Sequence, residues 1–409
     1  MKILVLNAGS SSQKSCLYEI ADNALPTQAA QPLWEGKINW TQDRAVAEIE
    51  VKTGTGATLQ ESISGDSPHA HLNYMLHTLS DGATKVIDQL SEIAVVGHRI
   101  VHGGQDYRDS VVITEDVKNA IARSSNLAPA HNPAALSGIE TIEKILKNVT
   151  QIAVFDTGFY ATLPDAAAIY PGPYEWVEQG IRRYGFHGIS HQYCSQRATQ
   201  ILGQDVPPER LITCHLGNGC SLAAIKNGRS IDTTMGFTPL EGLMMGSRSG
   251  SVDPGILIYL LRYCDYSVEK LDHVLNKASG LKGISGISSD MREVREAIAQ
   301  GNSRAQLAWD IYVHRLRSSI GAMLTSLGGL DALVFTAGVG ENSPEIRQAA
   351  CEALGFLGLK LDLEKNQQHP VDEDIATPDS AVRVLVIHTQ EDWAIAGQCW
   401  QLLKKSYEA

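Results

Sequence analysis

The sequence predicts an α/β protein made of two related halves. Short apolar, β-branched segments typical of buried strands alternate with helical patterns, which favours an α/β fold. A strand, a Gly-rich turn and a returning strand follow one another at the start of the chain, and the arrangement recurs about two hundred residues later. That spacing is too long for a solenoid, so we expect two halves with a cleft between them.

The first of these units occupies the N-terminal 20 residues. Residues 2–6 are apolar and predict a short buried strand, and residues 7–12 predict a tight polar turn. Residues 15–20 predict the returning strand. The polar stretch at residues 53–65 is expected to be a surface loop.

The second unit lies near the middle of the chain. Residues 211–214 predict a strand, residues 215–219 a Gly-rich turn, and residues 221–225 the returning strand. Asn227 and Gly228 then predict a hairpin turn of the primed type, because both positions accept positive φ angles.

The last third of the chain predicts a long helix and a further strand. Residues 331–336 predict the strand, which leads into a Gly-rich loop at residues 337–342. Ser343 and Pro344 predict the N-cap and first turn of another helix. Residues 303–327 repeat apolar residues at the helical period, and the expected buried face holds Leu307, Ile311, Leu316, Ile320, Met323 and Leu327.

Composition excludes several classes of protein. The chain has 409 residues, of which 43% are hydrophobic and 20% charged, so it is not a disordered chain and should hold about two to four domains. The 34 Lys and Arg against 46 Asp and Glu give a net charge of −12, which argues against a nucleic-acid partner. An anionic substrate must then be held by a few locally placed cations.

The cysteines and the apolar runs indicate a cytoplasmic, soluble protein. No apolar run approaches the ~20 residues that a membrane span needs, and the first one is too short for a signal peptide. The seven cysteines are odd in number and form no Cys-x-x-Cys pair, so we expect reduced, buried thiols. They are Cys16, Cys194, Cys214, Cys220, Cys264, Cys351 and Cys399.

Three Gly-rich loops follow strands, and such loops can present backbone N–H groups to phosphate oxygens. The P-loop motif is missing from the sequence. Gly338 and Gly340 lack the third glycine of the dinucleotide fingerprint. The loops therefore favour a nucleotide site modestly and match neither standard motif.

Histidine spacing does not favour a metal site. His187 and His191 are four residues apart, but a zinc protease needs Glu after the first histidine and Gly188 stands there. The pair His98 and His102 lies among glycines that make a regular helix doubtful. The remaining pair, His69 and His71, is expected in a polar surface loop.

Two arginines have small neighbours. Arg99 follows an apolar run and precedes Gly103 and Gly104, and Arg248 lies in a run of Gly and Ser. An arginine that reaches an anion in a tight site can use such neighbours, but an ordinary structural arginine fits this pattern about equally well.

Taken together, these segments resemble the acetokinase family. The resemblance extends from residue 3 to residue 392 in the family's order, and the stretch 235–242 is highly specific to it. The matching segments are 7–14, 97–104, 128–133, 155–159, 182–191, 215–219, 232–255, 335–342 and 389–392.

The resemblance implies a duplicated, two-domain actin-like ATPase fold, which is ribonuclease H-like, with ATP in the interdomain cleft. The implied domains are residues 1–160 with a returning helix at 393–409, and residues 161–392. The residue pattern itself predicts the connection between the halves at residues 160–180, a segment with three prolines. The implied reaction is a reversible, direct in-line transfer of the ATP γ-phosphoryl group to acetate, giving acetyl phosphate and ADP. The family also implies Mg²⁺, with Mn²⁺ as a substitute, and a homodimer.

The resemblance also assigns residue roles. Asn7 and Glu391 match the magnesium-site residues, and Lys14 matches a phosphate-contacting lysine. Arg99, His187 and Arg248 match the cluster around the transferring phosphoryl group, with Asp156 a further active-site residue. The implied walls of the acetate pocket are Val101, Phe186 and Pro239. The implied nucleotide-binding residues are His215, Leu216, Gly217, Asn218, Gly219, Asp290, Met291, Arg292, Gly338, Val339, Gly340, Glu341 and Asn342.

Asp156 needs no role as a base, because a carboxylic acid with a pKa near ~4 is already ionised at pH 7. We therefore hypothesise that Asp156 orients Arg99, Arg248 or a metal-bound water. Four residues depart from the family pattern: Gln13, Ala130, Ser251 and Gln390.

Three alternatives remain open from the sequence. Ala130 replaces a larger leucine, so propionate rather than acetate is an alternative substrate within the family. An oxidoreductase built on residues 338–342 would need a nicotinamide cofactor. A non-catalytic switch would bind ATP without turning over any acid.

Overall fold

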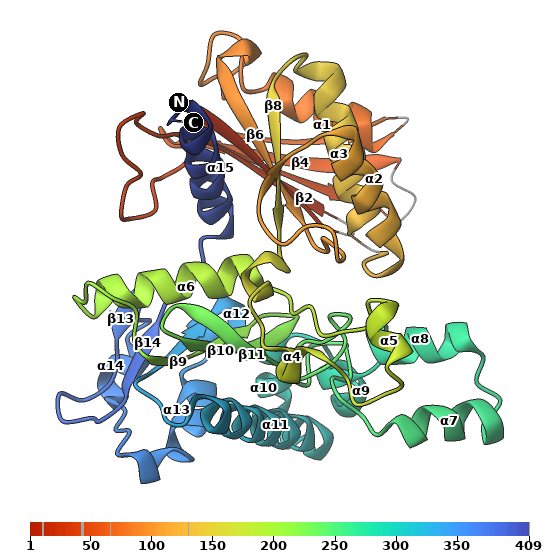
Figure 1. Ribbon diagram of the computed structural model, residues 1–409, viewed down its shortest axis with the longest axis vertical. Coiled ribbons are helices and arrows are strands. Elements are labelled where there is room, and N and C mark those ends of the chain that lie inside the picture. Colours follow the sequence, from red (N-terminus) through yellow and green to blue (C-terminus); the bar gives the residue numbers. More distant parts are fainter. Residues whose placement is uncertain (10–11, 42–44, 66, 130, 409) are drawn as a thin grey trace. The chain divides into compact units, whose positions relative to one another are not determined.

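The computed structural model describes residues 1–9, 12–41, 45–65, 67–129 and 131–408, and Figure 1 shows its elements. The chain divides into two compact units, Met1–Gly158 with Gln390–Ala409, and Phe159–Thr389. The domain boundaries that the family resemblance implies, at residues 160/161 and 392/393, stay a prediction.

The first unit is built on a mixed sheet of eight strands in the order β5-β4-β3-β2-β1-β6-β8-β7. β1 and β2 are antiparallel, and β1, β6 and β8 are parallel, which confirms the predicted strands at residues 2–6 and 15–20. The strands are β1 (Lys2–Ala8), β2 (Ser12–Glu19), β3 (Trp34–Trp40), β4 (Val46–Thr53), β5 (Thr58–Ser64), β6 (Ile93–Ile100), β7 (Val111–Val112) and β8 (Thr150–Phe155).

Two expectations for this unit are wrong. β5 lies inside the stretch 53–65 that was expected to be a loop, because this mostly exposed strand is held by pairing with β4 rather than by an apolar face. His69 and His71 lie on helix α1 rather than in a surface loop, and His71 is fully buried. The ring of His71 accepts a hydrogen bond from Trp40 Nε1 at 3.2 Å, so a tertiary partner that the sequence does not reveal explains its burial.

Helices pack on this sheet. α1 and α3 contact the sheet and each other, while α15, the last helix of the chain, returns to pack on β1 and β6. The helices are α1 (Pro68–His77), η1 (Leu90–Glu92), α2 (Glu115–Arg123), η2 (Ser124–Asn126), α3 (Asn132–Ile145) and α15 (Glu391–Glu408).

The second unit has a six-stranded sheet in the order β11-β10-β9-β12-β14-β13. The predicted strands at 211–214, 221–225 and 331–336 are confirmed. Asn227 and Gly228 have φ angles of 49° and 76°, which confirms the primed hairpin turn. The strands are β9 (Arg210–Leu216), β10 (Cys220–Lys226), β11 (Arg229–Thr233), β12 (Ala332–Thr336), β13 (Glu373–Asp374) and β14 (Arg383–Val386).

The two sheets share one topology. In the first unit a central strand, β1, begins an antiparallel run to β2 and β3 and lies parallel to β6 and then β8. In the second unit β9 has the same relation to β10 and β11 on one side and to β12 and β14 on the other. The repeated strand–turn–strand pattern in the sequence therefore marks a true structural duplication.

α6 and α11 cover the second sheet, and α11 confirms the predicted long helix (Figure 1). Leu307 is a wrong prediction: it is exposed, because the buried stripe begins at Ala305 and Ala308. Ile311 is half-buried. The helices are η3 (Gly158–Tyr160), α4 (Asp165–Ala168), α5 (Glu175–Glu178), α6 (Gly188–Ile201), α7 (Pro254–Tyr263), α8 (Val268–Lys277), α9 (Gly280–Ser285), α10 (Met291–Ala299), α11 (Ser303–Leu327), α12 (Ala337–Asn342), α13 (Pro344–Glu352), η4 (Gly355–Leu357) and α14 (Leu363–Gln367).

Residues 337–342 are a short helix, α12, rather than the predicted loop. The Glu341 carboxylate accepts a hydrogen bond from the backbone N–H of Ala337 at 2.7 Å, which closes the first turn of this glycine-containing segment. The expected start of α13 is confirmed, with Ser343 as N-cap and Pro344 at the first position.

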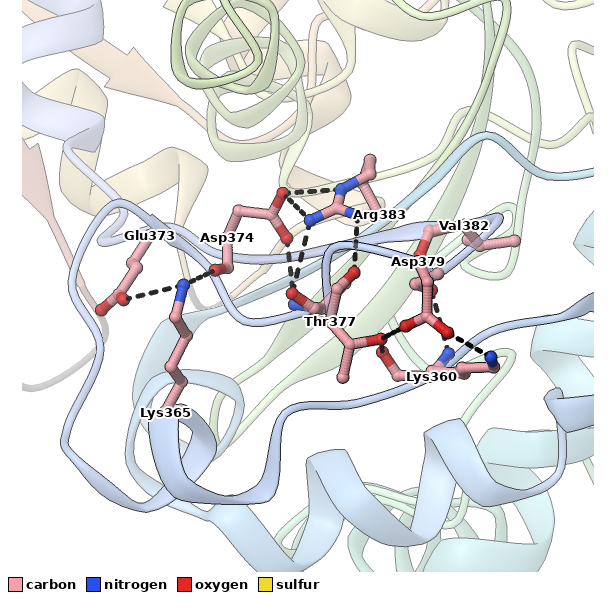
Figure 2. Close-up of polar contacts among 10 residues, drawn as sticks. Lys360, Lys365, Glu373, Asp374, Thr377, Asp379, Val382 and Arg383 are labelled. Atoms are coloured by element: carbon pink, nitrogen blue, oxygen red, sulfur yellow. Dashed lines mark hydrogen bonds and ion pairs between the residues drawn. The ribbon is translucent and has the colours of Figure 1, made fainter.

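Charged side chains hold the edge of the second sheet together. Figure 2 shows Arg383 of β14 bound to Asp374 of β13, with Nε 2.7 Å from the carboxylate, and to the carbonyl of Thr377 at 3.0 Å. Lys360, which precedes α14, pairs with Asp379 of the loop between β13 and β14. These contacts fix the edge strand pair, from which the chain continues into residues 387–389.

All seven cysteines are free, and six are buried, whereas Cys264 is half-buried. The described helices include none with the length and apolar character needed to cross a bilayer.

Gly97 is expected to be essential for the packing of α15 on β6. A Cβ added at Gly97 would lie 2.6 Å from Cys399 Sγ and 2.8 Å from Ile395 Cγ2, both in a buried helix–sheet contact. Gly97→Ala should lower the free energy of unfolding by about 1–3 kcal/mol in urea denaturation. Gly321→Ala, in α11 with no neighbour within 4 Å of its added Cβ, is the control and should raise it by about 0.5–1 kcal/mol. Equal effects of the two substitutions would contradict this account.

Candidate active site

A cluster of functional side chains lies in the first unit, at the carboxyl ends of three parallel strands. Asn7 lies near the end of β1, Arg99 near the end of β6, and Asp156 directly after β8. Carboxyl ends of parallel strands meet at one edge of a sheet, where α/β proteins commonly bind ligands. Arg99 donates to Asp156 Oδ2 at 2.5 Å and to Asn7 Oδ1 at 3.2 Å.

The start of α15 completes this cluster. Asn7 Nδ2 donates to Asp392 Oδ1 at 3.1 Å, and the Cys16 thiol lies 3.7 Å from the other oxygen of the same carboxylate. Asp392 was not a predicted site residue, although its position next to Glu391 in the matching segment 389–392 could have suggested it. Lys14 lies opposite Asn7 in the β1–β2 pair, and it is exposed.

Arg99 is charged and held among acidic groups. Burial alone would lower the pKa of its guanidinium, but the carboxylates of Asp156, Glu391 and Asp392 outweigh that effect and raise the pKa above its ordinary value. Asp156 is only 1% exposed. Arg99, one of the three partners that the sequence hypothesis names for Asp156, is in direct contact with it.

A second cluster lies in the second unit around Gly219. A Cβ added at Gly219 would lie 3.3 Å from Arg248 Nη1 and 3.4 Å from His187 Nε2, so both side chains reach the same Gly-rich turn. His187 has a φ angle of 56° at the start of α6, and its ring stacks on that of His215 with centroids 4.1 Å apart. The structure therefore brings His187, Arg248 and the turn at 215–219 together.

Buried hydroxyl groups that the sequence analysis missed hold these histidines. Ser221 Oγ lies 2.9 Å from His187 Nδ1, and Ser190 Oγ lies 2.8 Å from His215 Nδ1. Ser221 lies directly opposite His215 in the β9–β10 pair, so the alternation of these strands could have placed the two side chains on one face.

Arg248 is a half-buried cation without a carboxylate partner in the described part of the chain. Its Nη1 donates to the Pro239 carbonyl at 2.9 Å and contacts Met245 Sδ at 3.7 Å. Burial lowers the pKa of the Arg248 guanidinium. Burial acts in the same direction at Arg99, but the acidic neighbours of Arg99 outweigh it and raise the pKa. A bound anion would supply the missing countercharge.

The predicted nucleotide-binding residues do not all present free side chains. Leu216 and Met291 are buried in the core, and Asp290 pairs with the exposed Arg292 at 2.6 Å and caps α10. The backbone around Gly338 is open, since nothing lies within 4 Å of its added Cβ.

Glu341 holds the backbone around α12 in place. Its carboxylate accepts from the backbone N–H of Ala337 and, at 3.1 Å, from that of Thr389. Burial would raise the pKa of this carboxyl, but hydrogen bonds from His388 and the two backbone groups lower it below the ordinary value. Gly217, Asn218 and Gly219 form the turn after β9, and Gly340, Val339 and Asn342 belong to α12.

The predicted pocket residues divide between the units. Val101 is buried in the first unit, whereas Phe186 and Pro239 belong to the second. Ala130 lies outside the described residues. Of the other departures, Gln13 is 4% exposed on β2, and Ser251 Oγ accepts from the Gly242 N–H at 3.0 Å.

The donor set near Arg99 fits Mg²⁺ better than a transition metal. In the part of the chain that the structure describes, no three His, Cys, Asp or Glu side chains gather as a metal-binding group. Asn7, Glu391 and Asp392 offer hard oxygen atoms, and Mg²⁺ commonly uses one or two carboxylates together with water and substrate phosphates.

Comparison with known proteins identifies the family. Residues 2–397 match the model of the acetokinase family. The chain belongs to this family. An acetate kinase of Nostoc punctiforme is 89% identical over 404 residues, which are 99% of this chain and 100% of that protein.

Solved structures of acetokinases agree with the fold. The acetate kinase of Porphyromonas gingivalis has a TM-score of 0.90 at 40% identity and covers 98% of this chain and 99% of its own. A propionate kinase of Francisella tularensis has a TM-score of 0.87 at 38% identity, with 97% and 98% covered. The predicted α/β, actin-like ATPase fold is confirmed.

Proposed function

We propose that this chain transfers the γ-phosphoryl group of ATP to acetate, giving acetyl phosphate and ADP. The observation that carries the proposal is Arg248, a half-buried guanidinium without a carboxylate partner in the described residues, beside His187 and the glycine turn of the acetokinase family. The 89% identity to an acetate kinase supports acetate as the acceptor.

The reaction needs positive charge more than acid–base chemistry. A carboxylate oxygen attacks the γ-phosphorus in line, the bond from that phosphorus to the bridging oxygen breaks, and ADP leaves with the electron pair. Both reactants are anionic, and negative charge spreads over three equatorial oxygens in the transition state. Arg99 and Arg248 have planar donors that suit phosphoryl and carboxylate oxygens. His187 Nε2 supplies one further hydrogen bond.

Asp156 acts in this proposal by orienting Arg99. Their contact at 2.5 Å fixes the guanidinium, and the attacking acid is already ionised at neutral pH. Asn7 and Glu391 would hold Mg²⁺, which neutralises phosphate charge when bound. Lys14, the turn 215–219, residues 290–292 and α12 are the proposed nucleotide contacts.

We also propose a cytoplasmic homodimer that uses α7. This helix has an almost wholly apolar sequence and no buried residue. Ile256, Ile258, Tyr259 and Tyr263 are 48%, 51%, 56% and 72% exposed, which is an unusual patch for a monomer. A second copy of the chain would cover this patch, as the family resemblance suggests.

Removal of either arginine should strongly lower the rate of acyl phosphate formation. Acyl phosphate made from Mg-ATP with acetate, propionate or butyrate is trapped with hydroxylamine. Arg99→Ala and Arg248→Ala should each lower kcat/KM by about 10²-fold or more, because a charge-assisted contact to the phosphoryl group is lost. Arg123→Ala, which removes an exposed arginine, is the control.

Acetate should be the preferred acid. A higher kcat/KM with propionate than with acetate would change the assigned substrate but not the mechanism. If the protein binds ATP but forms no acyl phosphate from any acid, the proposed kinase activity is wrong. The protein would then be a nucleotide-dependent switch.

Asp156→Asn should lower kcat by about 10²-fold at every pH, because Arg99 loses its buried counterion. The measurement is kcat from pH 6 to 9, with Asp106→Asn at an exposed ion pair as the control. Recovery of Asp156→Asn activity at high pH would show that Asp156 acts as a base and would contradict the orienting role.

Ile258→Asp should convert the dimer to monomers in sedimentation equilibrium, because an unpaired charge would be buried at the interface. Val206→Asp is the matched control at an isolated apolar residue that is 69% exposed. A wild-type monomer, or a dimeric Ile258→Asp variant, would be incompatible with an interface on α7.

A further inference from the structure

A chain of four buried or half-buried polar groups leads to His187. Thr213 Oγ1 lies 2.6 Å from His191 Nδ1, and His191 Nε2 lies 2.8 Å from Ser221 Oγ. Ser221 Oγ in turn lies 2.9 Å from His187 Nδ1. Thr213, His191 and Ser221 are each 0% exposed, so none of these groups exchanges its partner with bulk water.

The single proton of the Ser221 hydroxyl links the protonation of the two neighbouring rings, His187 and His191. A serine hydroxyl has one proton, so it can donate to only one of the two ring nitrogens beside it. The other nitrogen must then carry a proton and donate to Ser221 Oγ. The protonation of neutral His187 is therefore tied to that of His191.

Thr213 determines the direction in which the hydrogen bonds from Thr213 to His187 are donated. Within the described residues, the hydrogen-bond partner of its hydroxyl is His191 Nδ1. A buried hydroxyl that accepted from His191 would leave its own proton without an acceptor, which is unfavourable. Thr213 therefore donates to His191 Nδ1, and the single proton of neutral His191 lies on Nε2.

The surroundings keep His191 neutral. Burial lowers the pKa of its ring well below the ordinary value, and the neighbouring ring of His215 lowers it further. The Tyr160 ring also lies against His191 in a T-shaped arrangement, with centroids 6.3 Å apart, and brings no charge.

We propose that Thr213, His191 and Ser221 are positioning residues that keep the proton of neutral His187 on Nε2. His191 donates to Ser221, and Ser221 donates to His187 Nδ1. The Nε2–H group then points to the position beside Gly219, where Arg248 Nη1 also lies. This inference deepens the proposed function, because a phosphoryl oxygen accepts from an N–H group and is repelled by a lone pair.

The tautomer itself gives a test that does not depend on activity. The full chain is labelled with ¹⁵N-histidine, and the His187 ring is assigned among the 13 histidines by the signals lost in His187→Gln. At about pH 8, where an unperturbed histidine is neutral, His187 Nδ1 should show a pyridine-type shift and Nε2 a pyrrole-type shift. The opposite pattern in the wild type would overturn the proposal.

Thr213→Val removes the terminal donor while nearly keeping the side-chain shape, and Thr213→Ser is the matched control that keeps the hydroxyl. In Thr213→Val the His187 shifts should move towards an average of both tautomers, and kcat should fall about tenfold with KM for acetate unchanged. Thr213→Ser should keep the wild-type shifts and kcat within about twofold. Ser221→Ala, which breaks the chain next to His187, should change the shifts even if Thr213→Val fails to fold.

Unchanged His187 shifts in both Thr213→Val and Ser221→Ala would overturn the role of the chain. The predicted tautomer in a protein without acetate-dependent activity would support the chain and overturn the proposed function, so the two failures are distinguishable.

Discussion

The buried ion pair between Arg99 and Asp156 is the interaction on which the first unit's functional edge depends. It joins the ends of β6 and β8, and Arg99 extends the contact to Asn7 on β1. Asn7 then binds Asp392 at the start of α15, so four elements far apart in sequence are held by one set of polar contacts. Burying these charges has a large desolvation cost, which is offset only because each charge meets a partner of opposite sign or a hydrogen bond.

Arg99 and Arg248, the two proposed phosphoryl-contacting arginines, differ in their surroundings. Acidic groups raise the pKa of Arg99 and hold its position, whereas burial lowers the pKa of Arg248, whose polar contacts are a carbonyl and a thioether. The first arginine is thus preorganised by the protein, and the second retains capacity for an anionic ligand. In a chain with a net charge of −12, such local arrangements decide whether an anionic substrate binds.

The histidines of the second unit are also held in place by their neighbours. His187 begins α6 in a left-handed conformation, stacks on His215 and contacts Ser221. Strand alternation on β9 and β10 places Thr213, His215 and Ser221 on one face of the sheet beside α6. A rigid sheet thereby fixes hydrogen-bond donors and acceptors that a loop would hold less firmly.

Much of the fold is determined by the sequence alone, because apolar period and turn residues are local signals. The strands at 2–6, 211–214 and 331–336, the long helix at 303–327 and the turn at Asn227 and Gly228 all follow from such signals and are confirmed. The family motifs likewise name Arg99, His187 and Arg248 before any contact is known.

Only the tertiary structure decides what those residues touch. It buries His71 through its contact with Trp40, and it turns Leu307 outward because the helix packs on neighbouring residues. It also pairs Arg99 with Asp156, adds Asp392 and Ser221, and leaves Arg248 with neutral contacts. The contacts of His71, of Arg99 and of Ser221 join side chains distant in sequence. Their approach is set by packing and by the balance of desolvation against pairing, and neither is encoded in a local pattern.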